Sequence, residues 1–249
     1  MKVSLITACF NNQDTIEDAL SSVIYQTYTN IEHIIIDGQS TDDTLSIVNK
    51  YKGNISRVVS ENDNGIYDAL NKGIKYATGD IVGFLHADDM LASNDVIEMI
   101  VNTFKNNPSI DAVYGDLQYV DRKNSGKVIR NWKSKPFQIN LFYKGWMPAH
   151  PTFYCKKECY LKYGVFNDKD FKTAADYELM LRFILKNKIN PYYLPKLIVK
   201  MRVGGVSNKS LKNRFKANLE DRKAWEINGL KPKFYTLYLK PLSKLIQYI

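Results

Sequence analysis

The first hundred residues alternate between short apolar runs and longer segments with helical spacing, and this order restricts the fold more than any other feature. The apolar runs predict strands at 2–8, 31–37, 56–61 and 80–86, and the intervening segments predict helices at 14–26, 41–51 and 65–77. Such an order is typical of a mostly parallel sheet covered by helices on both faces. We therefore predict an α/β fold.

Polar and loop-forming residues follow three of the predicted strands. In open parallel sheets, ligands bind outside the carboxyl ends of the strands. The residues at these ends are Thr7, Ala8 and Asn11 for the first strand, Asp37 for the second, and His86, Ala87, Asp88 and Asp89 for the fourth. Because these ends meet at one edge of the sheet, the sequence predicts a ligand site there.

Asp37 also has a purely structural interpretation. It is followed by Gly38, which allows a tight turn, and Ser40 or Thr41 can cap the next helix. In isolation Asp37 is therefore a turn former or cap, and only its convergence with the other strand ends indicates a ligand contact.

The adjacent carboxylates Asp88 and Asp89 raise the question of what neutralises them. Such a pair suits a hard divalent cation that leaves positions open for water and substrate phosphates. The alternative is that one of the two caps the helix predicted at 93–104.

The composition fits a folded protein inside the cell. With 249 residues, of which 45% are hydrophobic, the chain is long enough for one large domain or a domain with an appendage. Cys9, Cys155 and Cys159 are too few and too scattered for a disulfide framework, which predicts reduced thiols in the cytoplasm. No run of eighteen apolar residues is present, so we expect no membrane span.

The positive charge is concentrated at the C-terminus. Ten Lys/Arg and three Asp/Glu follow residue 208, so this part carries +7 of the net charge of +9. A nucleic-acid-binding protein is disfavoured, because no recognition motif accompanies the basic tail. The tail places apolar residues between lysines at roughly helical spacing, namely Phe234, Leu237, Tyr238, Leu242, Leu245, Ile246 and Ile249. It fits either an anionic membrane surface or a helix packed on the main domain.

Two stretches resemble the family 2 glycosyltransferases. They are "VSLITACFNNQDTIEDALSSVIYQTYTNIEHIIIDGQSTDDT" and "ENDNGIYDALNKGIKYATGDIVGFLHADD". The sequence is most similar to the branch acting in bacterial capsule, colanic acid and O-antigen synthesis. The resemblance implies a GT-A domain over residues 1–205, with a nucleotide-sugar part at 1–120 and an acceptor-side part at 121–205. Residues 206–249 are expected to form a basic, amphipathic helical extension.

The resemblance also implies roles for individual residues. Thr7 and Asp37 match the nucleotide contacts of the family, and "HADD" matches its metal motif, with His86 in the first acidic position. On this comparison Asp88 is the nucleotide-side carboxylate and Asp89 the direct metal contact, although which of them coordinates stays open. The donor-site candidates in "NDNGIYDALNKGI" are Asp63, Gly65, Asp68, Asn71 and Lys72. Asp68 and Lys72 have i,i+4 spacing and equally suit a helix-surface ion pair.

Asp176 in "KTAADYELMLRFILK" resembles the catalytic aspartate of the family. In an inverting transfer this carboxylate takes the proton of the acceptor hydroxyl. Neighbouring acids would raise its pKa, and a metal would oppose that shift. Without the resemblance, Asp176 is a helix cap. His150 lies in a histidine-containing segment near the acceptor side, where it can orient a phosphate or the acceptor sugar, or satisfy a loop carbonyl.

These observations predict an inverting, metal-dependent glycosyltransferase that uses Mn²⁺ or Mg²⁺. The favoured donor is a UDP-sugar carrying a hexose or N-acetylhexosamine, and the acceptor is a glycan on a polyprenyl diphosphate at the inner membrane face. The main alternative is a non-catalytic binding module of the same fold, which His86 in the metal motif favours. A sugar-1-phosphate nucleotidyltransferase should begin with a glycine-rich phosphate loop. This activity is disfavoured, because the N-terminal stretch "VSLITACFNNQD" contains no glycine.

Overall fold

Strands and helices alternate along the N-terminal half, as the sequence predicts. The structure is a computed structural model that describes residues 1–204 and 211–243, with the side chains of 211–217 and 241–243 left aside. The strands are β1 Val3–Cys9, β2 Ile31–Asp37, β3 Arg57–Ser60, β4 Ile81–Phe84, β5 Asp89–Leu91, β6 Ala112–Val120, β7 Val128–Trp132, β8 Tyr154–Lys156 and β9 Pro191–Arg202.

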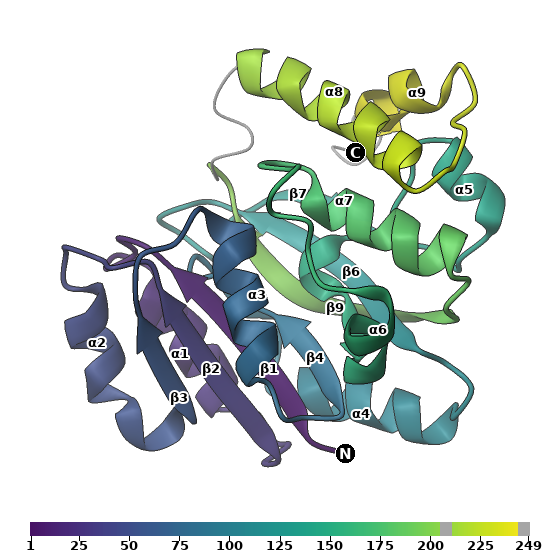
Figure 1. The fold of residues 1–249 in the computed structure, drawn as a ribbon. Helices are drawn as coiled ribbons and strands as arrows, with labels where there is room; N and C mark the ends of the chain where they lie inside the picture. The colour runs from purple at the N-terminus through teal and green to yellow at the C-terminus, as the bar shows by residue number, and fades with distance from the viewer. Residues whose placement is uncertain (205–210, 244–249) are drawn as a thin grey trace.

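The helices cover the sheet and extend to the C-terminal part (Figure 1). The α-helices are α1 Ile16–Ile24, α2 Thr44–Lys50, α3 Ile66–Tyr76, α4 Val96–Asn106, α5 Ile139–Tyr143, α6 Lys157–Tyr163, α7 Ala175–Met180, α8 Leu211–Ile227 and α9 Thr236–Ser243. Two short 3-10 helices, η1 Lys52–Asn54 and η2 His150–Thr152, and the π-helical turn η3 Leu181–Lys186 complete the described elements.

The described residues form one sheet in the order β3-β2-β1-β4-β8-β6-β9-β5, and β7 pairs with β6. Strands β3, β2, β1 and β4 are all parallel, which confirms the prediction for this half. The other half is mixed: β6 and β9 are parallel, whereas β4–β8, β6–β8, β5–β9 and β6–β7 are antiparallel. The predicted parallel character therefore holds mainly for the N-terminal half.

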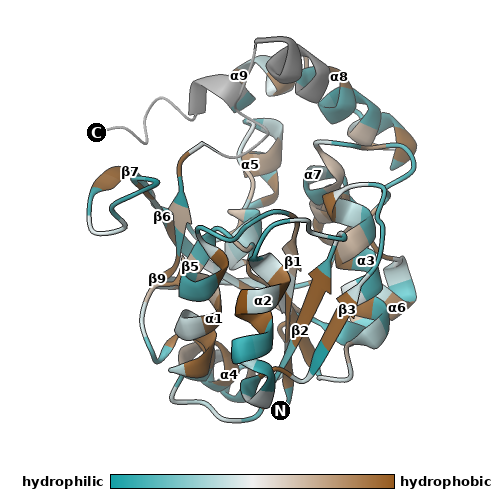
Figure 2. Ribbon diagram, turned by 90° about the vertical axis from the view of Figure 1, so that its left-hand side faces the viewer, coloured by the Kyte–Doolittle hydropathy of each residue, from teal (hydrophilic) through white to brown (hydrophobic). Residues whose placement is uncertain are grey.

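Both faces of the sheet are buried, as the α/β prediction requires. Neighbouring residues of β1 point to opposite faces: Ile6 packs in one apolar cluster with residues of α3 and α7, and Leu5 packs in another with residues of α1 and α4. Figure 2 shows the parallel strands in the brown of apolar residues, with hydrophilic positions on the surrounding helices. The apolar run of β1 thus follows from burial on both sides.

The helices begin at other residues than the sequence indicated. Helix α2 begins after Asp43. The Ser40 hydroxyl donates to Asp37 instead of capping this helix. Helix α4 follows Asp95, so the interpretation of Asp88 or Asp89 as its cap is wrong.

The C-terminal extension packs on the main domain beside α7 and α5 (Figures 1 and 2). Trp225 of α8 is fully buried, and Leu237 of α9 is 5% exposed. Phe234 and Tyr238 are 88% and 69% exposed, so the extension has a packed side and an outward aromatic side. Leu242 lies in α9, with its side chain left aside, and the other apolar tail positions, Leu245, Ile246 and Ile249, and the predicted boundary at 205/206 lie outside the described residues. Among the described residues, no helix is both long and apolar enough to cross a membrane.

Candidate active site

The predicted ligand edge lies where the strand order changes direction. β1 pairs with β2 on one side and with β4 on the other, so the chain winds away from β1 in two directions. Doubly wound sheets bind ligands outside the carboxyl ends of the strands at such a point. The residues that follow β1 and β4 are therefore the place to look for a site.

Asp37 lies fully buried at the end of β2 and is held by serines. Its carboxylate accepts hydrogen bonds from the Ser40 hydroxyl at 2.5 Å, the Ser40 amide at 3.1 Å and the Ser60 hydroxyl at 2.6 Å. Cys9 of β1 also faces it, at 3.7 Å between Sγ and Oδ1. Asp37 therefore fixes the turn after β2, and its contacts agree with the interpretation of this residue as a turn former.

The residues after β1 are also held by internal contacts. The Thr7 hydroxyl lies 3.0 Å from Nε2 of the buried His33, so it points into the protein. Ala8 is 8% exposed. Asn11 adopts a positive φ of 52°, and its side-chain oxygen accepts from the Thr41 amide at 2.8 Å. Asn11 thus ties the loop after β1 to the loop after β2.

Asp63 lies against the turn that follows β2. A Cβ atom added to Gly38 would lie 2.5 Å from Oδ2 of Asp63, so only glycine allows this approach. Asp63 Oδ1 accepts from the amide of Gly65, whose φ of 114° also favours glycine. The predicted donor-site residue Asp63 is therefore brought against the turn that follows Asp37, and Gly65 contacts it through its amide.

Asp68 and Lys72 form the ion pair that their spacing suggested. Lys72 Nζ lies 3.6 Å from Asp68 and 3.1 Å from Glu61. Asn71 differs from the prediction, because its amide oxygen accepts from the Phe166 amide and its nitrogen donates to the Phe166 carbonyl, both at 2.9 Å. Its side chain therefore clamps another loop and does not offer these atoms to a donor.

Asp176 lies at the centre of a second group of side chains. Its Oδ2 is 3.0 Å from Nδ1 of His150, and its Oδ1 accepts a hydrogen bond from the Tyr67 hydroxyl at 3.0 Å. Nε2 of His150 lies 3.4 Å from Nε2 of His86. The fold thus joins residues from α3, the end of β4, η2 and α7 in one chain of contacts. The loop-carbonyl interpretation of His150 is wrong, since Nδ1 faces a carboxylate.

The charges in this group follow from its contacts. Burial alone would raise the pKa of Asp176, but His150 and the charge of Lys240 lower this pKa below its usual value. The raised pKa expected from neighbouring acids is therefore wrong. Burial and the neighbouring His150 lower the pKa of His86 to about 4, so this ring is neutral near pH 7.

When His150 is neutral, the contacts define its hydrogen bonds. The Asp176 anion then accepts the Nδ1–H of His150, which leaves Nε2 of His150 as an acceptor toward His86. Nδ1 of His86 is buried and has no partner among the described residues, which suits an acceptor nitrogen better than an N–H donor. An imidazole held by a carboxylate in this way is suited to take up a proton.

The acidic pair after β4 divides into one buried and one partly exposed residue. Asp89 is fully buried: its Oδ1 faces the amide of Arg202 at 3.3 Å, and its Oδ2 has no partner among the described residues. Burial and the neighbouring Asp88 raise the pKa of Asp89 well above its usual value. Asp88 is partly exposed, and its carbonyl accepts from Arg202 at 3.1 Å.

A metal site built from protein groups alone is not present in the described part of the chain. No cluster of three His, Cys, Asp or Glu side chains there is arranged to hold a metal ion. A hard cation that keeps waters and substrate phosphates needs only one or two carboxylates from the protein. The partly exposed Asp88 fits this role, whereas the buried Asp89, tied to the backbone of Arg202, fits it less well.

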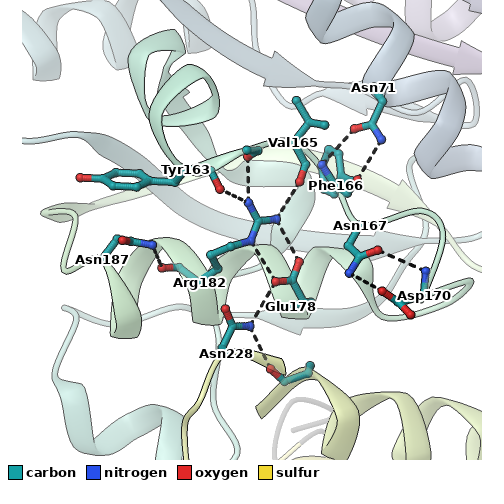
Figure 3. Close-up of polar contacts among 12 residues, drawn as sticks. Asn71, Tyr163, Val165, Phe166, Asn167, Asp170, Glu178, Arg182, Asn187 and Asn228 are labelled. Carbon is teal, nitrogen blue, oxygen red and sulfur yellow. Dashed lines mark hydrogen bonds and ion pairs between the residues drawn. The ribbon is translucent and has the colours of Figure 1, made fainter. Parts of the chain in front are cut away.

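A network beside the site joins Glu178 of α7 through Arg182 to the turn at Tyr163–Val165 (Figure 3). Arg182 bonds Glu178 at 2.9 Å and donates to the carbonyls of Tyr163, Gly164 and Val165. The same turn carries Phe166, which stacks on Tyr67 with ring centroids 5.5 Å apart. Glu178 of α7 belongs to this network, whereas Asp176 contacts His150 and Tyr67.

Two residues of the site were missed by sequence reasoning. Tyr67 lies inside the quoted motif "GIYDALNKGI", and its position one residue before Asp68 gave a signal that was not used. Arg202 contacts Asp18, Asp88 and Asp89, but an arginine at the end of a strand has no local signal for these partners.

The comparisons agree with the resemblance to the family 2 glycosyltransferases. The model of the glycosyl transferase family 2 matches residues 4–165. An uncharacterised glycosyltransferase of Mycobacterium tuberculosis is 34% identical over 185 residues, which are 74% of this chain and 69% of that protein. A glycosyltransferase of PGL/p-HBAD biosynthesis from Mycobacterium bovis is 26% identical, covering 85% of this chain and 81% of that protein.

Solved structures share the fold. TarS of S. aureus in complex with UDP superposes with a TM-score of 0.70 at 19% identity, covering 96% of this chain and 68% of that chain. A mannosyltransferase of Pyrobaculum calidifontis in complex with GDP-Man and Mn²⁺ gives a TM-score of 0.69 at 20% identity, again with 96% and 68% covered. The fold is therefore GT-A, as predicted from the resemblance.

Proposed function

The chain belongs to glycosyl transferase family 2, and from this premise we propose that it is an inverting, metal-dependent transferase of a hexose or N-acetylhexosamine. The donor is a nucleotide-diphosphate sugar, and UDP is the favoured nucleotide. The acceptor is a glycan carried by a polyprenyl diphosphate, as in bacterial surface polysaccharide synthesis.

The observation that carries this proposal is the contact of Asp176 with His150 beside the end of β4. An acceptor hydroxyl must lose a proton while its oxygen attacks the anomeric carbon. In the proposed reaction the Asp176–His150 pair takes that proton. The new bond joins the acceptor oxygen to the anomeric carbon, and the bond to the diphosphate oxygen breaks on the opposite side. Its electrons leave with the nucleoside diphosphate.

The negative charge of the leaving diphosphate must be neutralised, and we propose that this happens near Asp88. Bound Mn²⁺ or Mg²⁺ would neutralise the diphosphate as it leaves. We propose Asp88 as the carboxylate that holds this ion, with Asp89 as a buried neighbour that supports the turn. This reverses the order of the two residues suggested by the resemblance, because Asp89 is the one without exposure. His86 then belongs to the chain of contacts with His150.

The donor part of the site is assigned to the loops after β1, β2 and β3. Asn11, Asp37, Gly38 and Asp63 lie together there, and we propose that this group receives the nucleoside. The names of solved relatives support a nucleotide sugar, because TarS is bound to UDP or UDP-GlcNAc and the mannosyltransferase to GDP-Man. Lys72 and Asp68 are assigned to the outer side of this part.

The acceptor and the location are proposed from the extension. Phe234 and Tyr238 are exposed aromatic residues close to Lys231 and Lys233, a combination that suits an anionic membrane surface. The enzyme would then act at the inner membrane face, where a polyprenyl-linked acceptor is present. Double substitution Phe234→Ser with Tyr238→Ser tests this part, and unchanged co-sedimentation with anionic vesicles would exclude it.

A nucleotide-release assay tests the reaction itself. UDP-, GDP- and dTDP-sugars are offered with Mn²⁺ or with EDTA to wild type, Asp88→Ala and Asp176→Asn. Metal-dependent release that is lost in both variants supports the proposal. If wild type neither binds any of the donors nor releases nucleotide from them, the non-catalytic binding module becomes the better description. Binding without release indicates that the assay lacks the acceptor.

A further inference from the structure

Helix α8 reaches the segment that carries Asp176. Glu220 of this helix is 8% exposed. Its Oε2 accepts hydrogen bonds from the amides of Lys172, Thr173 and Ala174 at 3.2, 2.8 and 3.0 Å, and from the Thr173 hydroxyl at 2.9 Å. One carboxylate oxygen thus gathers three consecutive backbone N–H groups immediately before α7.

These contacts fix the backbone where Asp176 leaves it. Ala174 is the residue before α7, and Asp176 lies two positions further along. Buried N–H groups require partners, and a charged acceptor binds them more strongly than a neutral one. The direction in which α7 begins, and with it the direction of the Asp176 side chain, therefore depends on Glu220.

The extension also holds the residues that follow Asp176. Trp225 Nε1 donates to the Tyr177 hydroxyl at 2.9 Å, and Asn228 donates to Glu178 Oε1 at 3.1 Å. Lys240 of α9 lies 3.4 Å from the centre of the Tyr177 ring and 2.5 Å from Asp221. The backbone around Asp176 is thus held on both sides by α8 and α9.

We propose that Glu220 is a positioning residue that orients Asp176 toward His150, so that the C-terminal extension belongs to the catalytic apparatus. This inference rests on the proposed function, because it assigns Glu220 through the role of Asp176. The family model ends at residue 165, and Glu220 lies beyond it.

The test compares two substitutions of Glu220. Glu220→Met keeps the length of the side chain and removes the acceptor, whereas Glu220→Gln keeps a neutral acceptor oxygen. For Glu220→Met we expect kcat to fall on the order of 10- to 100-fold with an unchanged KM for the donor, since a small misplacement of a reacting group costs this much. Glu220→Gln is expected to restore most of the loss.

Lys223→Met is the matched control. Lys223 lies on the same helix and bonds Asp170 in the same loop at 2.7 Å, but both side chains are more than 40% exposed. This variant is expected to keep the kcat of wild type.

The outcomes separate this inference from the proposed function. An active wild type with a Glu220→Met variant of equal kcat overturns the inference and leaves the proposed function standing. A Glu220→Met variant that loses donor binding and thermal stability together with kcat also overturns it, because Glu220 would then support the fold in general. A wild type without donor binding contradicts the proposed function first.

Discussion

Two groups of acidic residues near opposite ends of the parallel strands have different surroundings, namely Glu32 at the amino end of β2 and the pair Asp88 and Asp89 after β4. At the amino end, Glu32 accepts from Lys2 and Thr78 at 2.6 to 2.8 Å and from Ser4 at 2.5 Å. At the carboxyl end, Asp89 Oδ2 has no partner among the described residues, and Asp88 is partly exposed. Buried polar groups normally have hydrogen-bond partners, so Asp89 Oδ2 differs from the carboxylate of Glu32. Glu32 is held by the fold, whereas we propose that Asp88 serves the reaction and that Asp89 supports the turn beside it.

The pKa of Glu32 records the same difference. Burial tends to raise this pKa, but the hydrogen bonds from Lys2, Ser4 and Thr78 lower it to about 2. At the other end of the sheet, the pKa of Asp89 is raised well above its usual value by burial and by Asp88. One carboxylate is thus stabilised as an anion by the fold, and the other is destabilised by it.

The largest effect is expected for Asp176→Asn. This variant removes the negative charge that His150 and Tyr67 contact, and general-base catalysis contributes about 10²- to 10⁴-fold to a rate. We expect kcat for transfer to fall by about this factor, measured as nucleotide release with saturating donor and acceptor. Asp170→Asn, in the exposed bridge to Lys223, is the control. A loss in both variants would contradict a specific role of Asp176.

The second effect concerns Arg202→Met, which breaks the contacts at the acidic pair. Arg202 is 4% exposed and contacts Asp18 and the Asp88 carbonyl. Removing one partner of a buried ion pair costs about 3–5 kcal/mol, but Asp18 is 55% exposed and is rehydrated, so a loss near the lower end is expected. Denaturant unfolding measures this loss. An unchanged free energy of unfolding would show that Arg202 does not hold the turn.

A smaller effect on stability is expected for Glu32→Gln at the opposite end. Hydrogen bonds to a charged group contribute about 1.5–3 kcal/mol, so the free energy of unfolding is expected to fall by about 2 kcal/mol at pH 7. The kcat for transfer is expected to stay unchanged, since Glu32 lies at the amino end of β2. A large loss of kcat with intact stability would remove the distinction between the two ends.

The pH dependence of stability tests the same residue. The pKa of Glu32 is lower in the folded protein, about 2, than the ordinary value of 4.5. Its contribution is therefore present above pH 4.5 and is lost as the pH falls toward 2. The difference in unfolding free energy between wild type and Glu32→Gln is expected to shrink across this window. A difference that stays constant would contradict the cause given for the lowered pKa.

The smallest effect is expected for Lys72→Met. Its ion pairs with Glu61 and Asp68 lie near the surface, where such pairs contribute about 0–1 kcal/mol. If Lys72 takes part only in these ion pairs, we expect Lys72→Met to leave the KM for the donor unchanged. A KM for the donor that rises severalfold would instead indicate that Lys72 belongs to the donor site, as the resemblance implies.

The parallel half of the fold could be predicted because its signals are local. Each strand from β1 to β4 is a short apolar run, and α1 to α3 show helical spacing within a few turns. The burial of β1, β2 and β4 on both faces follows from the same residues, whereas β3 at the edge of the sheet is partly exposed. The antiparallel strands β5, β7 and β8 have three to five residues each, and β5 and β8 pair with distant segments, so their sequences carry little signal.

The candidate site was predicted in its residues but less well in its contacts. Asp176, His86 and His150 were each selected, yet their mutual contacts depend on how η2 and α7 pack, which no local pattern encodes. Asn71 was assigned to the donor because it lies within a recognised motif. Its partner, the backbone of Phe166, is separated from it by 95 positions and is visible only in the folded chain.

The assignment of the nucleotide site to the carboxyl end of the sheet can be tested by calorimetric binding of UDP and GDP in the presence of Mn²⁺ to wild type, Asp88→Ala and Glu32→Gln. We expect wild type and Glu32→Gln to bind one of the nucleotides equally well. Asp88→Ala is expected to bind it at least about tenfold more weakly, which corresponds to about 1.4 kcal/mol. Equal binding by Asp88→Ala and wild type, or weakened binding by Glu32→Gln alone, would contradict the assignment of the site to the carboxyl end of the sheet.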